Sequence, residues 1–294
     1  MSKQKKADLL LVMITAFWGM SYFLTDLCLG EMPPMFLNAF RFLAAFLLLG
    51  VIFFKNVRQV NAVTLKYSLF VGLALAGCYI FYGYAITRTS LSNAGFICAL
   101  PVVFTPVLDF LFRGTKPRRR LLFSLALCTV GLALMTLNEQ FRPRSGDLLS
   151  LGVALTYSVD LLLTEEAVRR PEVDPIALGV CQLAVVGVLT LALSLLFETP
   201  AFPRTPSVWA AALFLGIFCS GIAFVIQSVQ QQYTTAAHVG LIFTLEPVFS
   251  AAVAFLLADE VLRPRGYLGA VLMLLSLVLM EAEWPKRKGP QSPE

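Results

Sequence analysis

Long apolar segments recur along almost the whole 294-residue chain, and they constrain its fold more than any other feature. A bilayer core about 30 Å thick needs about 20 helical residues for each crossing. Backbone amides in lipid must be hydrogen-bonded within their own segment, so these segments are expected to be helices. We predict ten spans, at residues 8–28, 34–54, 66–87, 90–112, 120–138, 147–167, 175–197, 207–231, 235–258 and 265–283.

Composition agrees with lipid as the main solvent of this chain. Only 14% of the residues are charged and 58% are hydrophobic, whereas a soluble domain has about 25% charged residues. The first apolar segment follows Lys3, Lys5 and Lys6 and runs to about Cys28. This is too long for the apolar core of a signal peptide, so we expect a retained first span. The predicted fold class is an all-α, multi-pass membrane protein.

The distribution of Lys and Arg predicts the orientation. If the N-terminus is cytoplasmic, the segments on that side carry 16 of these residues and the opposite segments carry 6. Basic residues are concentrated on the cytoplasmic side of membrane proteins. We therefore predict that both termini are cytoplasmic, in the inner membrane of a bacterial cell, and that the number of spans is even.

The two halves of the chain resemble each other at an offset of about 140 residues. Five spans in each half would make the second half enter the membrane in the opposite orientation, which gives an inverted repeat. We predict one domain over residues 1–294, with repeats at about 7–139 and 147–283. The three matched pairs of segments are Pro34–Arg41 with Pro175–Gln182, Ala16–Ser21 with Ala154–Val159, and Thr89–Ile97 with Thr234–Ile242.

Short motifs spread over nearly the whole chain add a family resemblance. They include Phe17-Trp18-Gly19 in the first span, Val102–Pro106 in the fourth, Asp174–Ala177 at the seventh and Leu245–Phe249 in the ninth. Together they resemble the EamA-type branch of the drug/metabolite transporter superfamily. The resemblance implies ten spans in two inverted five-helix repeats. It also implies secondary active transport, frequently the export of amino acids and related metabolites.

Glu246 is a candidate functional residue because it lies near the middle of the ninth span and Pro247 follows it. Charged side chains inside a membrane are costly and often functional. Proline removes a backbone donor, so we expect a kink or break at this point. Glu246 is predicted to couple transport to protons through its charge, and the alternative is a structural carboxyl that bonds freed backbone groups.

Two further side chains are candidates for coupling. Asp160 lies midway along the sixth span with no cation one turn away, so we expect it to be protonated, to face water or to pair with Arg41 of the second span. His238, the only histidine, lies near the start of the ninth span. It is either a proton relay or a hydrogen-bonded residue at a helix end.

Aromatic and amide side chains predict a substrate cavity between the halves. Trp18 and Tyr22 share a face of the first span, as Tyr79 and Tyr82 do in the third. Such side chains offer apolar area and hydrogen bonds, although simple helix packing also explains each of them. The predicted substrate-binding residues are Trp18, Tyr22, Tyr79, Tyr82, Asn93, Tyr157, Gln227 and Glu246.

No catalytic, metal or cofactor site is expected, because the six cysteines lack metal-ligand spacing and no nucleotide-binding or hydrolase motif occurs. The expected partners are a small-molecule substrate and membrane lipid, not nucleic acid, with a monomer and a homodimer both open. The leading hypothesis is a secondary active transporter of a small metabolite that works by alternating access. Its alternatives are a transporter of organic cations such as quaternary amines, which acidic and aromatic residues would suit, and, more remotely, an intramembrane enzyme.

Overall fold

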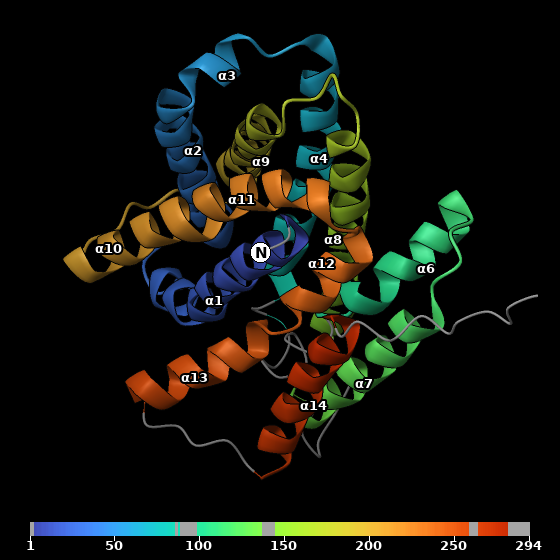
Figure 1. Cartoon of the computed structure of the whole chain (residues 1–294). Coiled ribbons are helices and arrows are strands. Elements are labelled where there is room, and N and C mark those ends of the chain that lie inside the picture. The colour runs from blue at the N-terminus through green and yellow to red at the C-terminus, as the bar shows by residue number, and fades with distance from the viewer. Residues whose placement is uncertain (1–2, 86–87, 89–98, 137–144, 259–263, 282–294) are drawn as a thin grey trace, which may run out of the picture.

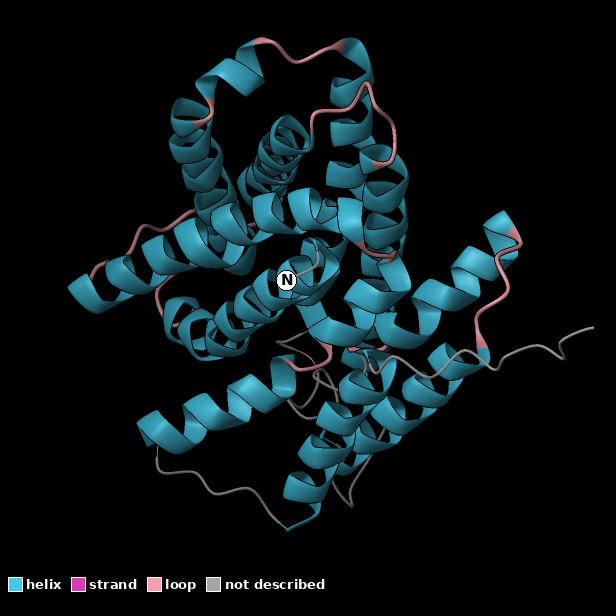
Figure 2. Ribbon diagram, in the orientation of Figure 1, coloured by secondary structure: helices cyan, strands magenta, loops and turns pink. Residues whose placement is uncertain are grey.

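The computed structural model describes residues 3–85, 88, 99–136, 145–258 and 264–281. Every regular element in these ranges is a helix (Figure 2). Seven described segments are long and apolar enough to cross a membrane. The chain is therefore an all-α, multi-pass membrane protein, as predicted. The arrangement as ten spans in two inverted repeats stays a prediction.

The helices of the first half follow the predicted spans closely. Helices α1, α2 and α4 each cover most of a predicted span, whereas the fourth predicted span is described only from residue 99 onward. A short extra helix, α3, follows the second span. The elements are α1 (Lys3–Leu29), α2 (Pro34–Ile52), α3 (Phe54–Arg58), α4 (Ala62–Ala85), α6 (Pro101–Arg113) and α7 (Arg119–Thr136).

The second half contains two spans that are not continuous α-helices. The eighth span changes to a π-helix in its middle, and the ninth is broken in two. The elements are α8 (Ser145–Val168), α9 (Pro175–Phe197), α10 (Pro206–Phe214), η1 (Leu215–Ile222, π-helix), α11 (Ala223–Gln230), η2 (Gln231–Tyr233, 3₁₀), α12 (Ala236–Phe243), α13 (Glu246–Ala258) and α14 (Pro264–Glu281).

Helix ends are set by local sequence. Proline is the first residue of α2, α6, α9, α10 and α14, where its missing N–H costs no helical hydrogen bond. Asp174 caps α9, since its carboxylate accepts hydrogen bonds from the backbone of Ile176 (2.9 Å) and Ala177 (3.3 Å). Gly114 ends α6 in the left-handed conformation (φ 68°) that glycine adopts at least cost.

Two carboxylates connect the two halves of the chain by capping helices. Both lie at the end of the molecule where the chain passes from α1 to α2, which we call the α1–α2 end. Glu198, after α9, accepts hydrogen bonds from the backbone of Met35 and Phe36 at the start of α2 (both 3.0 Å). Glu31, between α1 and α2, accepts from the backbone and hydroxyl of Thr205 before α10 (3.2 and 2.9 Å). The backbone N–H of Arg204 also donates to Glu31, and chiefly this bond lowers the pKa of its carboxyl. Each half thus holds a helix start of the other.

The helices enclose a centre occupied by α1 and α12 (Figure 1). On one side α4 packs against α8 and α9, and α2 packs against α9. On the other side α7 and α14 lie side by side, with α13 nearby (Figure 1). Large apolar side chains such as Val51, Phe112 and Leu196 are more than 70% exposed on the outer surface. This is the expected surface of a protein in contact with lipid.

Candidate functional site

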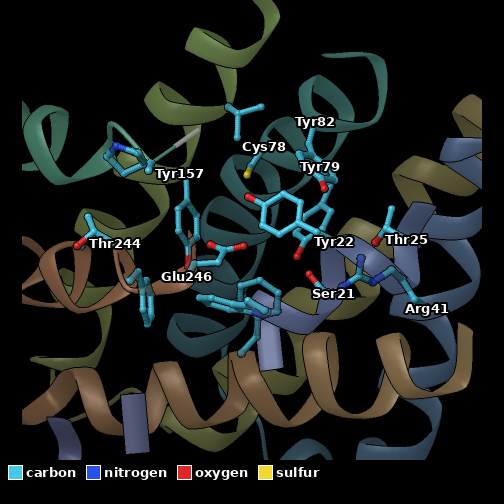
Figure 3. A pocket seen from close by; sticks show the side chains of 17 residues that line it. Ser21, Tyr22, Thr25, Arg41, Cys78, Tyr79, Tyr82, Tyr157, Thr244 and Glu246 are labelled. Atoms are coloured by element: carbon cyan, nitrogen blue, oxygen red, sulfur yellow. The ribbon is translucent and has the colours of Figure 1, made fainter. Parts of the chain in front are cut away.

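A cavity of about 100 Å³ lies among the central helices (Figure 3). Its walls come from both halves of the chain: α1, α2, α4 and α6 from the first, and α8, α11, α12 and α13 from the second. The sequence-predicted residues that line it are Trp18, Tyr22, Tyr79, Tyr82, Tyr157 and Glu246. Six residues from four segments that are far apart in the sequence therefore meet around one space.

Trp18 forms the centre of one aromatic wall. Its ring packs edge-on against Phe243 (centroids 4.7 Å apart) and lies 5.5 Å from Phe224. Tyr157 stacks on Phe243 at 6.2 Å. The indole N–H donates a hydrogen bond to the Cys219 carbonyl of the π-helix (2.7 Å). This bond fixes the ring, so the wall is a rigid apolar surface with its polar atom already satisfied.

Tyrosines form a second wall. Tyr82 lies 6.3 Å from Tyr22 and 6.5 Å from Tyr79, ring centroid to ring centroid. Tyr79 packs against Phe42 at 4.6 Å. Because these rings come from α1, α2 and α4, the wall belongs entirely to the first half.

Glu246 is the first residue of α13, directly after a break in the ninth span. Thr244 and Leu245 form a turn between α12 and α13, and Pro247 occupies the first turn of α13. The interruption that Pro247 predicted is therefore present, as a turn that ends two residues before the proline. The Glu246 carboxyl faces the cavity and has the Tyr22 hydroxyl as a hydrogen-bond partner (Figure 3).

A close approach of backbones sets the position of Glu246 relative to Trp18. A methyl group on Gly19 would lie 2.5 Å from Phe249 Cβ and 2.8 Å from the Ser250 backbone nitrogen. Only glycine allows α1 and α13 to come this close. The contact brings the residue before Gly19, Trp18, to the same cavity as the carboxyl of Glu246.

Asp160 lies behind the cavity wall and is fully buried. The Gln227 amide donates to Asp160 Oδ2 (3.1 Å), and the Tyr157 hydroxyl donates to Gln227 Oε1 (3.2 Å). Gln227, predicted to line the cavity, thus lies one step behind it and connects Tyr157 to Asp160. The suggested partner Arg41 bonds elsewhere, so these two residues do not form an ion pair.

Arg41 is a charged cavity residue that sequence reasoning did not assign to the site. It is 2% exposed and lines the cavity, and its Nε–H donates to the Ser220 hydroxyl of η1 (2.7 Å). Its guanidinium lies over the ring of Tyr79 at 5.2 Å. The available signal was an arginine inside an apolar span, which is itself a functional candidate.

Besides Gln227 and Asp160, two further predicted residues are not placed at this cavity. Asn93 lies outside the described residues. His238 lies at the start of α12, where its Nε2 is 3.2 Å from Asp8 Oδ1 of α1. It borders a second, larger cavity at one end of the molecule, so it is separate from the central group.

This end cavity has a volume of about 640 Å³ and a strongly basic lining. Glu165 connects the helices that form its wall. The Glu165 carboxylate pairs with Arg113 (3.3 Å) and with Arg169, and it accepts from the Ala236 backbone at the start of α12 (3.2 Å). Arg113 also contacts Asp109 and Glu166 at 3.4 and 3.6 Å. The end cavity therefore has a polar, ionic wall that ties α6 and α8 to α12.

Comparison with known proteins agrees with this architecture. The family model described as the EamA-like transporter family matches the chain twice, at residues 5–137 and 144–281. An uncharacterized transporter of Archaeoglobus fulgidus is 26% identical over 95% of this chain and 86% of its own. The uncharacterized transporter YvbV of Bacillus subtilis is 23% identical over 96% and 94%. A crystal structure that is 19% identical superposes with a TM-score of 0.77 over 94% of this chain and 96% of that one, which shows the shared fold. The chain belongs to the EamA-like transporter family and is a membrane transporter.

Proposed function

We propose that this chain is a secondary active transporter that moves a small metabolite, an amino acid or a related compound, outward by alternating access. The observation that carries the proposal is the central cavity, whose walls are contributed by both halves and whose edge is the broken ninth span with Glu246. Broken helices at the interface of two repeats are typical substrate and ion sites in such transporters.

The proposed arrangement is ten spans in two inverted five-helix repeats within a single domain. Its support is the double match of the family model, since each matched segment covers five predicted spans. An odd number of spans in each repeat requires opposite orientations of the two. The proposed location is the bacterial inner membrane with both termini in the cytoplasm, supported by the 16 to 6 distribution of basic residues.

The proposed coupling group is Glu246. Its carboxyl reaches the cavity at the point where the backbone is not helical, and a hydroxyl partner is supplied by the opposite half. A carboxyl in this position is exposed to water only when the cavity is open, so its proton can exchange with one side at a time. Asp160 is the second candidate, since it connects to the cavity through Gln227 and Tyr157.

The experiment is exchange in vesicles that contain the purified protein. Vesicles loaded with an unlabelled amino acid should accumulate the labelled form, and an imposed proton gradient should raise the uptake further. Trp18→Ala should abolish the exchange, because it removes the centre of one cavity wall. If quaternary amines exchange and amino acids do not, the cation alternative replaces this substrate class. If neither class exchanges in vesicles with folded protein, the proposed transport of small metabolites is wrong.

A further inference from the structure

Arg41 carries a buried positive charge that no carboxylate neutralises among the described residues. Its side chain is 2% exposed. Among the described residues, its side chain makes one hydrogen bond, which Nε–H donates to the Ser220 hydroxyl. The rings of Phe42 and Tyr79 lie 5.6 and 5.2 Å from the guanidinium carbon. A buried charge without an ionic partner is costly, so an arginine placed in this way is expected to meet an anion in the working protein.

The guanidinium is held in a defined orientation toward the cavity. Since Nε is bonded to Ser220, the edge that carries the two terminal nitrogens is left for another acceptor. Arg41 lies on one side of the cavity together with the hydroxyl residues Ser21 and Thr25, and Glu246 lies across from them beside Tyr157 (Figure 3).

The π-helix η1 supports this orientation through its contact with α2. A methyl group on Gly216 would lie 3.1 Å from the Arg41 carbonyl oxygen, and one on Gly221 would lie 3.2 Å from Ala45 Cβ. Ser220, between these glycines in sequence, reaches the Arg41 side chain from the same segment. The segment therefore fixes both the backbone and the side chain of Arg41. π-helical turns are frequent at functional sites, where they displace a side chain or a carbonyl from its α-helical position.

We propose that Arg41 binds the carboxylate of the transported molecule and that Ser220 positions Arg41 for this contact. This inference rests on the proposed function and adds the group that the substrate must carry. The terminal edge of a guanidinium matches the two oxygens of a carboxylate. The Glu246 carboxyl lines the same cavity and disfavours a doubly charged anion such as a phosphate monoester, so a monoanionic carboxylate suits the cavity best. An organic cation without a carboxylate would leave Arg41 unpaired.

The test compares acids with their amides, because an amide keeps the shape of the acid and removes its negative charge. Binding of alanine, leucine and phenylalanine to the purified full chain is measured by calorimetry beside binding of alaninamide, leucinamide and phenylalaninamide. At least one acid should bind about tenfold more tightly than its amide, as expected for charge-assisted hydrogen bonds. Arg41→Gln should remove this difference, and Arg41→Lys should restore only part of it.

Ser220→Ala keeps the charge and removes the positioning bond, so it should reduce the acid-to-amide ratio severalfold while the protein stays folded. If Arg41→Gln does not fold, this variant decides the question. Ser158→Ala is the matched control, because the Ser158 hydroxyl is equally buried but, within the described part of the chain, donates to the Ala154 carbonyl of its own helix and to no other helix. A merely structural role of Arg41 would lower stability without changing the ratio.

The inference is overturned if each amide binds as tightly as its acid, or if Ser220→Ala and folded Arg41 variants keep the wild-type ratio. If exchange in vesicles still occurs in that case, the proposed transport function stands and only the inference about Arg41 fails. If folded wild-type protein neither binds nor exchanges any acid or amide, the proposed function fails and the inference about Arg41 fails with it.

Discussion

The two cavities of this transporter differ in whether their charged side chains have partners of opposite charge. The central cavity has aromatic walls and contains the cation Arg41 on one side and the carboxyl of Glu246 across from it. The end cavity contains six cations and two carboxylates, namely Lys5, Arg113, Lys116, Arg118, Arg120 and Arg169 with Asp109 and Glu165. In the end cavity the best-connected cations, Arg113 and Arg169, have carboxylates within ion-pair distance.

The difference indicates two roles for charged side chains. Those of the end cavity connect helices through ion pairs, whereas we propose that Arg41 in the central cavity binds a ligand. Ion pairs near water contribute little each, and their value lies in the network they form. A charge that is removed from water and left without a partner is retained only where function requires it. The walls differ as well: the central cavity is built by tight backbone contacts such as that at Gly19, and the end cavity by ionic contacts.

The largest expected effect is on gradient-driven transport, and it should distinguish Glu246 from Glu165. Glu246→Gln keeps the size of the side chain and removes its titration, so gradient-driven transport should fall about tenfold or more while exchange without a gradient survives. Glu165→Gln, the control at the end cavity, should leave the dependence on the gradient unchanged. Uptake into vesicles at several imposed pH differences measures both. Wild-type pH dependence in Glu246→Gln would leave only a structural role for this residue and would make Asp160 the next candidate.

The second prediction tests the tight wall of the central cavity. Gly19→Ala should destabilise the protein by about 1–3 kcal/mol, because the added methyl group meets backbone atoms of α13 that cannot rotate away. Gly50→Ala in α2 is the control, since a methyl group there has nothing within 4 Å, and it should be neutral or stabilising by about 0.5–1 kcal/mol. Denaturation in detergent gives both values. Equal stability of the two variants would contradict the close contact of α1 and α13.

The third prediction tests the ionic wall of the end cavity. Glu165→Gln should cost about 1–2 kcal/mol, less than the ~3–5 kcal/mol of breaking a fully buried pair, because Arg169 is 59% exposed and water replaces part of its interaction. The loss should decrease when Arg113→Gln is already present, since the two side chains share one network. A double-mutant cycle measures this coupling, and strict additivity would show that Glu165 does not connect α6 to α8.

The smallest effect concerns Glu31, an exposed carboxylate at the α1–α2 end. Its pKa is lower in the folded chain than its usual value, chiefly because the Arg204 backbone N–H donates to it. A lowered pKa means that the stabilisation is present above the usual glutamate pKa and is lost as the pH falls through the lowered one. The wild type should therefore exceed Glu31→Gln in melting temperature at neutral pH by a small margin that disappears in acid. A margin that grows in acid would show that the carboxylate does not stabilise this helix start.

Much of the helical framework was predictable from the sequence. The seventh span was predicted at residues 175–197 and α9 has these bounds, because Asp174 and Pro175 form a local cap that needs no other part of the chain. The break at Glu246 was also predicted, since it follows from the missing N–H of Pro247. The π-helix was not predicted, because its sequence, Leu215–Ile222, has the apolar character of any membrane span.

The candidate site was predictable only in part. The aromatic residues and Glu246 were identified because their side chains are unusual inside apolar segments, and six of them do line one cavity. Asp160 and Arg41 were considered as a pair, and the structure gives each a different partner, Gln227 and Ser220. Spacing along one helix does not show which helices are neighbours.

The sequence by itself therefore determined the membrane class, most helix ends and the polar residues that lipid would not tolerate. These properties depend on solvation and on contacts within a few residues. Only the tertiary structure decided that Arg41 faces the cavity, that Gln227 lies behind it and that His238 belongs to the other end. The physical reason is that these outcomes depend on which backbones approach closely, and glycines such as Gly19 and Gly216 set those approaches between helices that are remote in the chain.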